Sequence, residues 1–428
     1  MNHSKSGGQV ERNVESDKTI AILAYRFPPY SGIGAMRVRC LTEHLPSFGW
    51  KPIVFTSEWT EDNCDRIDHN CASEILDAVV SRASRLDPNK TGLPGKLRRI
   101  ALLVNELRNR RRFATETRRA FQQWVRRNGK PDLVLATYPV GACFDVAHQI
   151  NREFKLPWIA DFRDLPDYLH RFPAYAIHRL KGSVASADQL LTVSKPLAET
   201  LEARHAKKVM HLPNGYERKP GGTPISRQTA KNSKFTITYT GLLYPPGHPA
   251  RVAPSIYLDA LDQLGQENKI DLSKVAVRLI GTKTPAVKKH FTGRASEKCV
   301  EIVEWCEREV AAEEQRNADL LICLGSLELE GIVTGKVFEY INSGTPVLST
   351  PHDKDGVGHV LKHSGAGETV ATIEEAKLGI LRVYKRWLDP NDEPLQLDHE
   401  FIRQFDWDVL TGRFAECCDN LLTRGVDR

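Results

Sequence analysis

The stretch Lys336-Val337-Phe338-Glu339-Tyr340, followed by Ser343-Gly344-Thr345-Pro346-Val347-Leu348, holds the strongest structural and chemical signal in the chain. An apolar run at 318–324 and a loop ending at Gly335 precede it, which predicts a buried strand, a turn and then a helix. Lys336 and Glu339 share one face at the start of that helix, where free N–H groups and the helix dipole attract anions. The pattern suits a phosphorylated ribose, with Lys336 on phosphate and Glu339 on the hydroxyls. Taken alone, it also fits a solvated Lys–Glu pair on an ordinary helix.

Short apolar runs alternate with helical patterns outward from this stretch in both directions. Strands are predicted at 19–25, 52–56, 132–137, 158–161, 190–193 and 209–212, and again at 236–240, 275–280, 300–303, 320–324 and 346–349; helices are predicted at 37–48, 142–154, 253–264 and 406–422. This alternation predicts right-handed βαβ units and parallel sheets. The polar segment 217–234, rich in Gly and Pro, divides the two series and predicts a linker. The fold class is therefore α/β, with two Rossmann-like domains.

Composition sets the broad class of the protein. The chain has 428 residues, enough for two cores, with 41% hydrophobic and 27% charged residues, as in water-soluble globular proteins. No run reaches the roughly 18 apolar residues of a spanning helix. Residues 1–18 are polar and predict a disordered tail without a signal-peptide core. The 9 cysteines show no C-x-x-C spacing, which favours reduced thiols, a cytoplasmic location and no metal site.

Positive charge concentrates between residues 96 and 130. The Lys and Arg residues there are opposed only by Glu106 and Glu116, and Ile100, Leu103, Val104 and Leu107 recur among them at helical spacing. A basic amphipathic helix predicts contact with an anionic membrane surface, as in a peripheral protein at the inner membrane face. A solvated basic face with Leu103 and Leu107 packed inward fits the pattern equally well. We recognise no nucleic-acid-binding motif in this segment and predict no nucleic-acid partner.

Candidate binding residues follow the predicted strands, where ligands of open parallel sheets bind. Gly32 and Gly34 come directly after the first strand and let backbone N–H groups approach an anion or a sugar, just ahead of the helix that carries Arg37. Arg37 stands where a G-x-G-x-x-G motif needs a small residue, and no acidic residue ends the second strand, which disfavours a nicotinamide cofactor. A tight strand-to-helix turn is the alternative interpretation.

The segment Asp161-Phe162-Arg163-Asp164 ends another predicted strand. Asp161 or Asp164 could bind an acceptor hydroxyl, and Arg163 could bind phosphate. An internal Asp–Arg pair that stabilises the loop is the alternative.

Four stretches, in this order and spacing, resemble the family 4 glycosyltransferases, which have the GT-B fold: Phe27-Pro28-Pro29-Tyr30-Ser31-Gly32-Ile33-Gly34-Ala35-Met36-Arg37, Ala160-Asp161-Phe162-Arg163-Asp164, Leu212-Pro213-Asn214-Gly215-Tyr216 and the block 336–346. The resemblance runs from about residue 19 to the final helix. It implies two Rossmann-like domains whose parallel sheets face a central cleft. Residues 19–216 would form the acceptor domain, 235–400 the nucleotide-sugar donor domain, and 401–428 a helix that crosses back to the first domain.

The resemblance also assigns roles to single residues. It implies that Asn214, Gly241, Gly335, Lys336 and Glu339 bind the donor together with Gly32, Gly34 and Arg37, and that Arg251 supplies a charge for the diphosphate. Relatives carry a pair of glutamates at fixed spacing in this region. Glu339 matches the second, whereas the first would fall on Gly331, with Glu330 one residue out of register. The sequence thus departs from the family near the donor sugar.

The implied activity is transfer of a sugar from a nucleotide-sugar to a saccharide or lipid-linked acceptor, with retention of configuration, in the synthesis of a cell-surface polysaccharide or glycoconjugate. Asp161, Arg163 and Lys336 are the predicted catalytic residues. We recognise no Asp-x-Asp as a metal-binding motif, and we predict no cofactor and no metal because cations meet the leaving diphosphate. A nucleotide-sugar epimerase of the same fold, or a non-enzymatic basic protein that binds a membrane or polyanion, are the alternatives.

Overall fold

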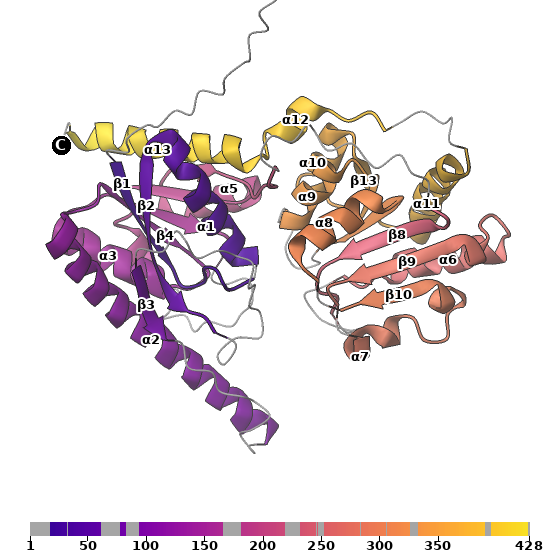
Figure 1. Cartoon of the computed structure of the whole chain (residues 1–428), viewed down its shortest axis with the longest axis horizontal. Coiled ribbons are helices and arrows are strands. Elements are labelled where there is room, and N and C mark those ends of the chain that lie inside the picture. The colour runs from indigo at the N-terminus through magenta and orange to yellow at the C-terminus, as the bar shows by residue number, and fades with distance from the viewer. Residues whose placement is uncertain are drawn as a thin grey trace, which may run out of the picture. The chain divides into compact units, whose positions relative to one another are not determined.

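The structure is a computed structural model that describes residues 18–31, 33–60, 78–82, 94–165, 181–218, 232–244, 246, 252–282, 284–304, 306–325, 333–389 and 395–426 (Figure 1). The chain divides into two compact units. Unit 1 comprises Met1–Arg163, Phe172–Leu191 and Thr411–Arg428, and unit 2 comprises Asp164–Arg171 and Thr192–Leu410. Among the described residues no helix combines the length and the apolar character that crossing a membrane requires.

The first sheet has the strand order β3-β2-β1-β4-β5-β6-β7. Its strands are β1 (Lys18–Ala24), β2 (Trp50–Glu58), β3 (Ala78–Arg82), β4 (Leu133–Thr137), β5 (Trp158–Phe162), β6 (Gln189–Thr192) and β7 (Val209–His211). The pairings of β1 with β2 and β4, and of β4 with β5, are parallel. β4 and β5 are buried along their whole length, as expected for a parallel sheet covered on both faces.

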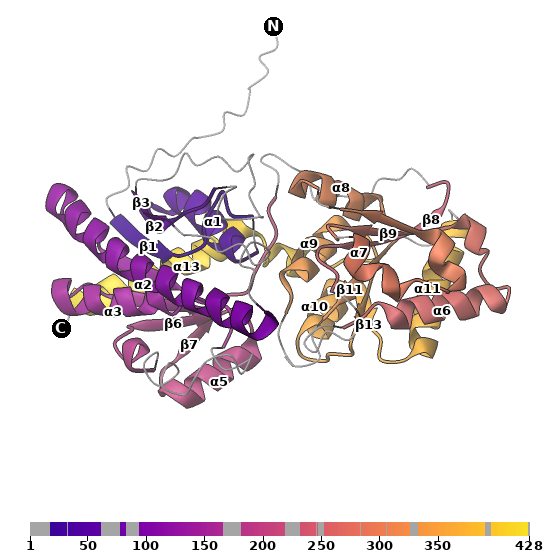
Figure 2. The same cartoon turned by 90° about the horizontal axis from the view of Figure 1, so that it is seen from below.

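The helices that surround this sheet are α1 (Ile33–His44), α2 (Gly95–Asn128), α3 (Ala142–Phe154), α5 (Lys195–His205) and α13 (Trp407–Val426). α2 and α3 lie side by side (Figure 2) and share the contact of Phe121 with Phe154. The end of α13 belongs to unit 1, where Asp419 forms an ion pair with Lys18 and accepts a hydrogen bond from the indole of Trp50.

The second sheet has the strand order β10-β9-β8-β11-β12-β13. It consists of β8 (Phe235–Thr240), β9 (Val275–Ile280), β10 (Val300–Val303), β11 (Leu320–Leu324), β12 (Val347–Thr350) and β13 (Gly367–Thr369), paired in parallel. Its helices are α6 (Ser255–Gln266), α7 (Thr284–Val287), α8 (Arg308–Asn317), α9 (Gly335–Ser343), α10 (Val357–Ser364), α11 (Ile373–Leu388) and α12 (His399–Arg403).

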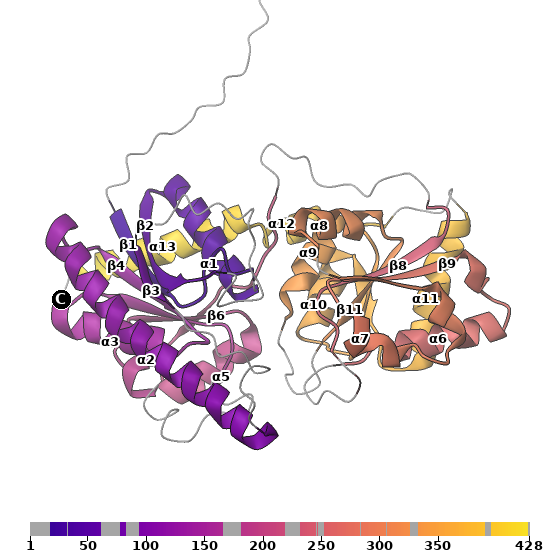
Figure 3. The same ribbon diagram turned by 60° about the horizontal axis from the view of Figure 1, so that its bottom comes forward.

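Two apolar clusters hold this second sheet between its helices. One cluster includes Tyr257 of α6 and Ile380 of α11, whose helices lie side by side (Figures 2 and 3). The other includes Phe338 of α9 and Leu361 of α10. The helices thus cover the sheet and leave the carboxyl ends of its strands as the edge where a ligand is expected.

The predicted α/β class with two Rossmann-like halves is confirmed. Every predicted strand is present, with ends that shift by a residue or two, as is usual at element boundaries. The helix expected from residue 253 begins at Ser255, since Pro254 is its N-cap residue. The sequence analysis missed β3 and β13, which are short edge strands. Residues 1–17 and most of the predicted linker, 219–231, lie outside the described residues.

Candidate functional site

Lys336 lies at the start of α9, next to the end of β8. Its Nζ donates a hydrogen bond of 2.8 Å to the hydroxyl of Tyr239 and lies 4.1 Å from the centroid of the Tyr239 ring. The Tyr239 hydroxyl in turn donates to the backbone carbonyl of Leu242 at 3.1 Å. One tyrosine therefore orders both the lysine and the chain just after β8, at the carboxyl edge of the sheet.

Two glycines make room for this lysine. Gly241, directly after β8, has φ 116°, and Gly281, directly after β9, has φ 84°, values that favour glycine. A Cβ on Gly241 would stand 2.6 Å from Nζ of Lys336, and one on Gly281 would stand 3.3 Å from Cα of Gly241. Thr282 fixes the pair by donating to the carbonyl of Gly241 at 2.9 Å. The backbone approaches closely here only because both residues lack side chains.

α9 is attached to β8 by buried hydrogen bonds. The Tyr340 hydroxyl accepts from the backbone N–H of Thr240 at 3.0 Å, and Gln315 of α8 donates to the Thr240 hydroxyl at 3.0 Å. Burial raises the pKa of Tyr340 well above its ordinary value, so this phenol keeps its proton. These bonds fix the N-terminus of α9, and with it Lys336, relative to the sheet. Gly335, the first residue of α9, is buried.

Glu339, one turn into α9, is paired rather than isolated. Nη2 of Arg308, the first residue of α8, lies 2.9 Å from Oε1 of Glu339, and its other terminal nitrogen binds Glu217. The side chains of Arg308 and Glu339 are 29% and 31% exposed, so the Glu339 side chain is partly accessible. The arrangement orients Glu339 while leaving acceptor capacity for a hydroxyl.

In unit 1, Arg37 and Asp161 form a buried ion pair. Both side chains are 1% exposed, and the guanidinium donates from Nε and Nη2 to the carboxylate, the latter bond being 3.0 Å. Thr137 of β4 donates to the same carboxylate at 3.2 Å. The pair ties α1 to the carboxyl ends of β4 and β5. The two side chains bind each other inside the unit, and this contact does not test a role toward substrate. The predicted roles of Arg37 in donor binding and of Asp161 in catalysis therefore stay predictions.

Arg163 joins the loop that follows β4 to the first turn of α1. Its Nε donates to the carbonyl of Tyr138 at 2.6 Å, and its Nη1 donates to the carbonyl of Gly34. A Cβ on Gly34 would collide with this guanidinium. Packing therefore requires glycine at this position, in addition to its predicted role in donor binding. Arg163 is half-buried, and its charge lies at the N-terminal end of α1. An anion at that end would meet both the charge and the helix dipole.

The remaining predicted residues divide into two groups. Asn214 is half-buried, and its neighbour Gly215 is needed for packing, since a Cβ there would collide with the carbonyl oxygen of Phe405. Gly32, Arg251, Glu330 and Gly331 lie outside the described residues.

Metal ligands are not grouped in the described part of the chain. It contains no group of three or more His, Cys, Asp or Glu residues placed to hold an ion. The chain does contain two Asp-x-Asp spacings, neither of which the sequence analysis took as a metal-binding motif. In one, Asp353 accepts from the backbone N–H groups of Asp355, Gly356 and Val357. In the other, Asp406 accepts from the N–H of Asp408. In both, the first aspartate binds backbone N–H groups at the start of a helix.

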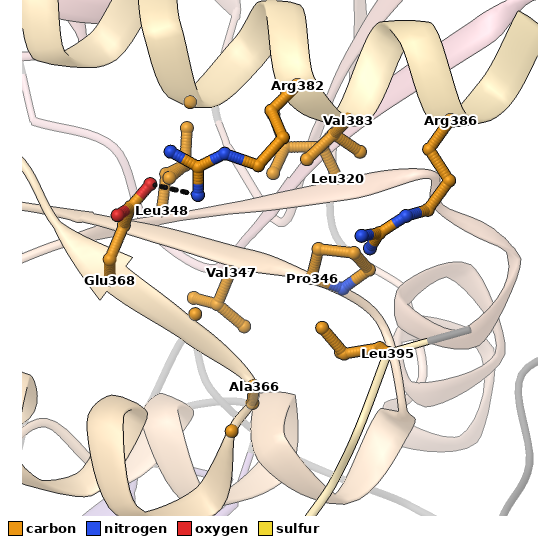
Figure 4. Close-up of a pocket in the computed structure, with 13 residues that line it drawn as sticks. Leu320, Pro346, Val347, Leu348, Ala366, Glu368, Arg382, Val383, Arg386 and Leu395 are labelled. Atoms are coloured by element: carbon orange, nitrogen blue, oxygen red, sulfur yellow. Dashed lines mark hydrogen bonds and ion pairs between the residues drawn. The ribbon is translucent and has the colours of Figure 1, made fainter. Parts of the chain in front are cut away.

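A cavity of about 210 Å³ opens on unit 2 beneath α11 (Figure 4). Leu320, Val347 and Gly367, which begin β11, β12 and β13, line it, so it lies at the amino edge of the sheet, opposite Lys336. Arg382 extends over it and pairs with Glu368 at 3.0 Å. The cavity is therefore separate from the residues grouped around Lys336.

The sequence analysis missed Tyr239, Gly281 and Arg308. Gly281 follows β9 just as Gly241 follows β8, and this repeated strand–glycine pattern was a usable signal. Tyr239 and Arg308 gave no signal, because only the three-dimensional fold brings them to Lys336 and Glu339.

Comparison with known proteins bears on the family and on the fold. Residues 34–219 match the profile of Glycosyltransferase Family 4. No curated protein matches the sequence. Sucrose-phosphate synthase from Thermosynechococcus elongatus superposes with a TM-score of 0.63 at 16% identity, covering 95% of this chain and 100% of that one. HepE from Anabaena, solved with UDP and glucose, gives a TM-score of 0.61 at 14% identity, covering 94% of this chain and 100% of that one.

A nucleotide-sugar epimerase also shares the fold. The putative UDP-N-acetylglucosamine 2-epimerase from Listeria monocytogenes superposes with a TM-score of 0.53 at 13% identity, covering 92% of this chain and 94% of that one. The profile match over residues 34–219 favours the glycosyltransferase class, between which and the epimerase class the fold does not distinguish. The resemblance seen in the sequence is therefore confirmed: residues 34–219 match the family 4 glycosyltransferase profile, and the chain has the GT-B fold of these solved structures.

Proposed function

We propose that the chain transfers a hexose from a uridine-type nucleotide-sugar to a saccharide or lipid-linked acceptor, with retention of configuration, in the synthesis of a cell-surface polysaccharide or glycoconjugate at the cytoplasmic face of a membrane. One observation carries the donor side of this proposal. The ammonium of Lys336 lies over Gly241 at the N-terminus of α9, with no side chain on Gly241 between them. Cation, helix N-terminus and approachable backbone together suit a diphosphate.

The solved relatives support the choice of nucleotide. HepE has been solved with UDP and with UDP-glucose. Because the sequence identity to HepE is low, the similarity supports a shared fold only. The nucleotide base and the sugar are therefore part of the proposal. Glu339 is the residue that we assign to the ribose, since Arg308 orients it and its side chain is partly accessible.

The proposed reaction breaks the bond between the anomeric carbon and the diphosphate oxygen, and the electron pair leaves with the diphosphate. Lys336 and the N–H groups at the start of α9 stabilise the negative charge that develops on the leaving group. The acceptor oxygen then bonds to the anomeric carbon on the face that the diphosphate left, and the proton of the acceptor hydroxyl passes to the departing diphosphate oxygen. Arg163 remains the predicted phosphate-binding residue of unit 1, and Asp161 a predicted catalytic one.

A thermal-shift titration tests the donor site. UDP and UDP-glucose should stabilise the protein, by about 2.7 kcal/mol when the ligand is at 100 times its dissociation constant. Lys336→Ala and Glu339→Ala should each weaken UDP binding by on the order of tenfold to a hundredfold, the worth of one charge-assisted contact. Lys362→Ala, which removes an exposed lysine from α10 of the same unit, is the matched control. Equal UDP affinity in the unaltered protein and all three variants would show that this site does not bind the donor.

Metal-independence is part of the same proposal, because cationic groups of the protein meet the diphosphate. Sugar transfer should persist in excess EDTA. Loss of transfer on chelation, restored by magnesium or manganese, would contradict it.

Acceptor dependence separates this proposal from the epimerase alternative, which the fold shared with the Listeria protein keeps open. A transferase releases UDP in step with glycosylated acceptor. An epimerase would convert the nucleotide-sugar without any acceptor. Absence of any nucleotide effect on stability would instead favour the non-enzymatic alternative.

A further inference from the structure

α2 carries an apolar stripe that faces away from the rest of unit 1. Leu97, Ile100, Val104 and Leu107 are 52%, 56%, 39% and 43% exposed. Their spacing of three, four and three residues places all four on one side of the helix. Figures 1 and 3 show the first turns of α2 reaching past the strands of unit 1. These side chains therefore form a surface and are not part of the core.

The packing face of α2 lies roughly opposite. Phe113 and Phe121 are fully buried, Phe113 against Tyr25 at 5.1 Å between ring centroids and Phe121 against Phe55 at 5.5 Å. The helix is thus attached to its unit without the stripe. The interpretation in which Leu107 packs inward is wrong, because the inward positions are those of Phe113 and its neighbours; the side chain of Leu103 lies outside the description.

Positive charge continues the stripe along the helix. Arg108 and Arg111 are exposed and lie on the same side, in the turns that follow Leu107. Within the described part of the chain neither has a carboxylate partner. The next arginines differ, since Arg110 pairs with Glu106 at 3.0 Å and Arg112 with Glu116 at 2.7 Å. Arg108 and Arg111 therefore carry unneutralised charge beside the apolar surface.

We propose that this face of α2, defined by Leu97, Ile100, Val104, Leu107, Arg108 and Arg111, docks on an anionic lipid bilayer. Apolar side chains at the interfacial depth and arginines at the headgroups are the two contacts that an interfacial helix makes. A second copy of the chain fits this face less well, because its own arginines would repel it. The proposal is independent of the donor site. Docking on the bilayer would bring the enzyme to the membrane that holds the predicted lipid-linked acceptor.

Co-sedimentation of the full chain with vesicles tests this proposal. Phosphatidylcholine vesicles containing phosphatidylglycerol should bind the protein, high salt should weaken binding, and pure phosphatidylcholine should bind little. Replacing both Arg108 and Arg111 by Ser should lower binding on the order of twentyfold to thirtyfold, at about fivefold per charge. Replacing both Ile100 and Val104 by Ser should lower it on the order of tenfold and leave the salt dependence in place.

Two control variants match these changes. Arg126→Ser with Arg127→Ser removes the same charge from the other end of α2, and Leu378→Ser with Leu388→Ser removes leucines that are 64% and 50% exposed on α11. Both controls should bind vesicles as the unaltered protein does. Equal losses in test and control variants would overturn the proposal, as would negligible binding to both vesicle types. A dimer that dissociates when the stripe is altered would make a second copy the occupant. UDP-dependent stabilisation should be the same in every variant, which separates failure of docking from failure of the transferase.

Discussion

Lys336 makes two contacts with one residue, since its Nζ donates to the hydroxyl of Tyr239 at 2.8 Å and lies 4.1 Å from the centroid of the same ring. An ammonium has three protons to donate, so the hydrogen bond to Tyr239 leaves two for a ligand. The tyrosine therefore holds the lysine in place without consuming its capacity. This makes Tyr239 a positioning residue for the proposed phosphate contact.

Removing the Tyr239 hydroxyl tests that role. Tyr239→Phe keeps the ring and its cation–π contact but loses the hydrogen bond to Lys336. We expect UDP affinity to fall about twofold to tenfold, the range for a net hydrogen bond of about 0.5–1.5 kcal/mol, as measured by isothermal titration calorimetry. Within a Lys336→Ala background the same change should have little further effect. A rise in UDP affinity would mean that the hydroxyl competes with the ligand for Lys336.

Substituting Gly241 separates backbone strain from crowding. Gly241→Ala should introduce both backbone strain and crowding, because φ is 116° and the new Cβ would stand 2.6 Å from Nζ of Lys336. Gly293→Ala, in the same unit, meets only strain, with φ 82° and nothing within 4 Å. Both should lower the free energy of unfolding by about 1–2 kcal/mol in urea titrations. Only Gly241→Ala should abolish UDP binding. Retained UDP affinity in Gly241→Ala would show that the position of Lys336 does not matter.

Arg308 should influence recognition of ribose through Glu339. Arg308→Met removes the partner at 2.9 Å and leaves the carboxylate free to rotate. We expect weaker UDP binding and, more specifically, a smaller preference for UDP over 2′-deoxy-UDP, measured by calorimetry. Glu339→Gln should shrink the same preference, and the double variant should add little to it, because the two residues act together. An unchanged preference in Arg308→Met would leave the pair as a surface ion pair worth about 0–1 kcal/mol.

The fold was accessible from the sequence because local patterns determine it. Apolar runs such as β4 and β11 are buried along almost their whole length, and burial on both faces of a parallel sheet is what removes polar residues from a strand. β13 escaped prediction because its residues, Gly367 to Thr369, are only half-buried and carry no apolar run. Short edge strands are defined by pairing with a neighbour, which no local pattern shows.

The site was accessible only in part. Local sequence patterns identify three of its residues: Gly241 directly follows a strand, and Lys336 and Glu339 lie near the start of a helix. Tyr239 and Arg308 act through partners that are distant in the sequence and adjacent only in the fold.

The buried pair of Arg37 and Asp161 decides between a structural and a catalytic role for Asp161. Asp161→Asn would leave a guanidinium that is 1% exposed without its counter-charge, at a cost of about 3–5 kcal/mol in the free energy of unfolding. Replacing both residues, Arg37→Met with Asp161→Leu, should recover much of that loss, because the buried charge is then gone as well. Urea denaturation of the three proteins measures both effects, and a transfer assay at a temperature where all three are folded reads activity. Activity in the double variant would make the pair a brace for α1. Unchanged stability in Asp161→Asn with activity abolished would establish instead that the carboxylate acts on the substrate.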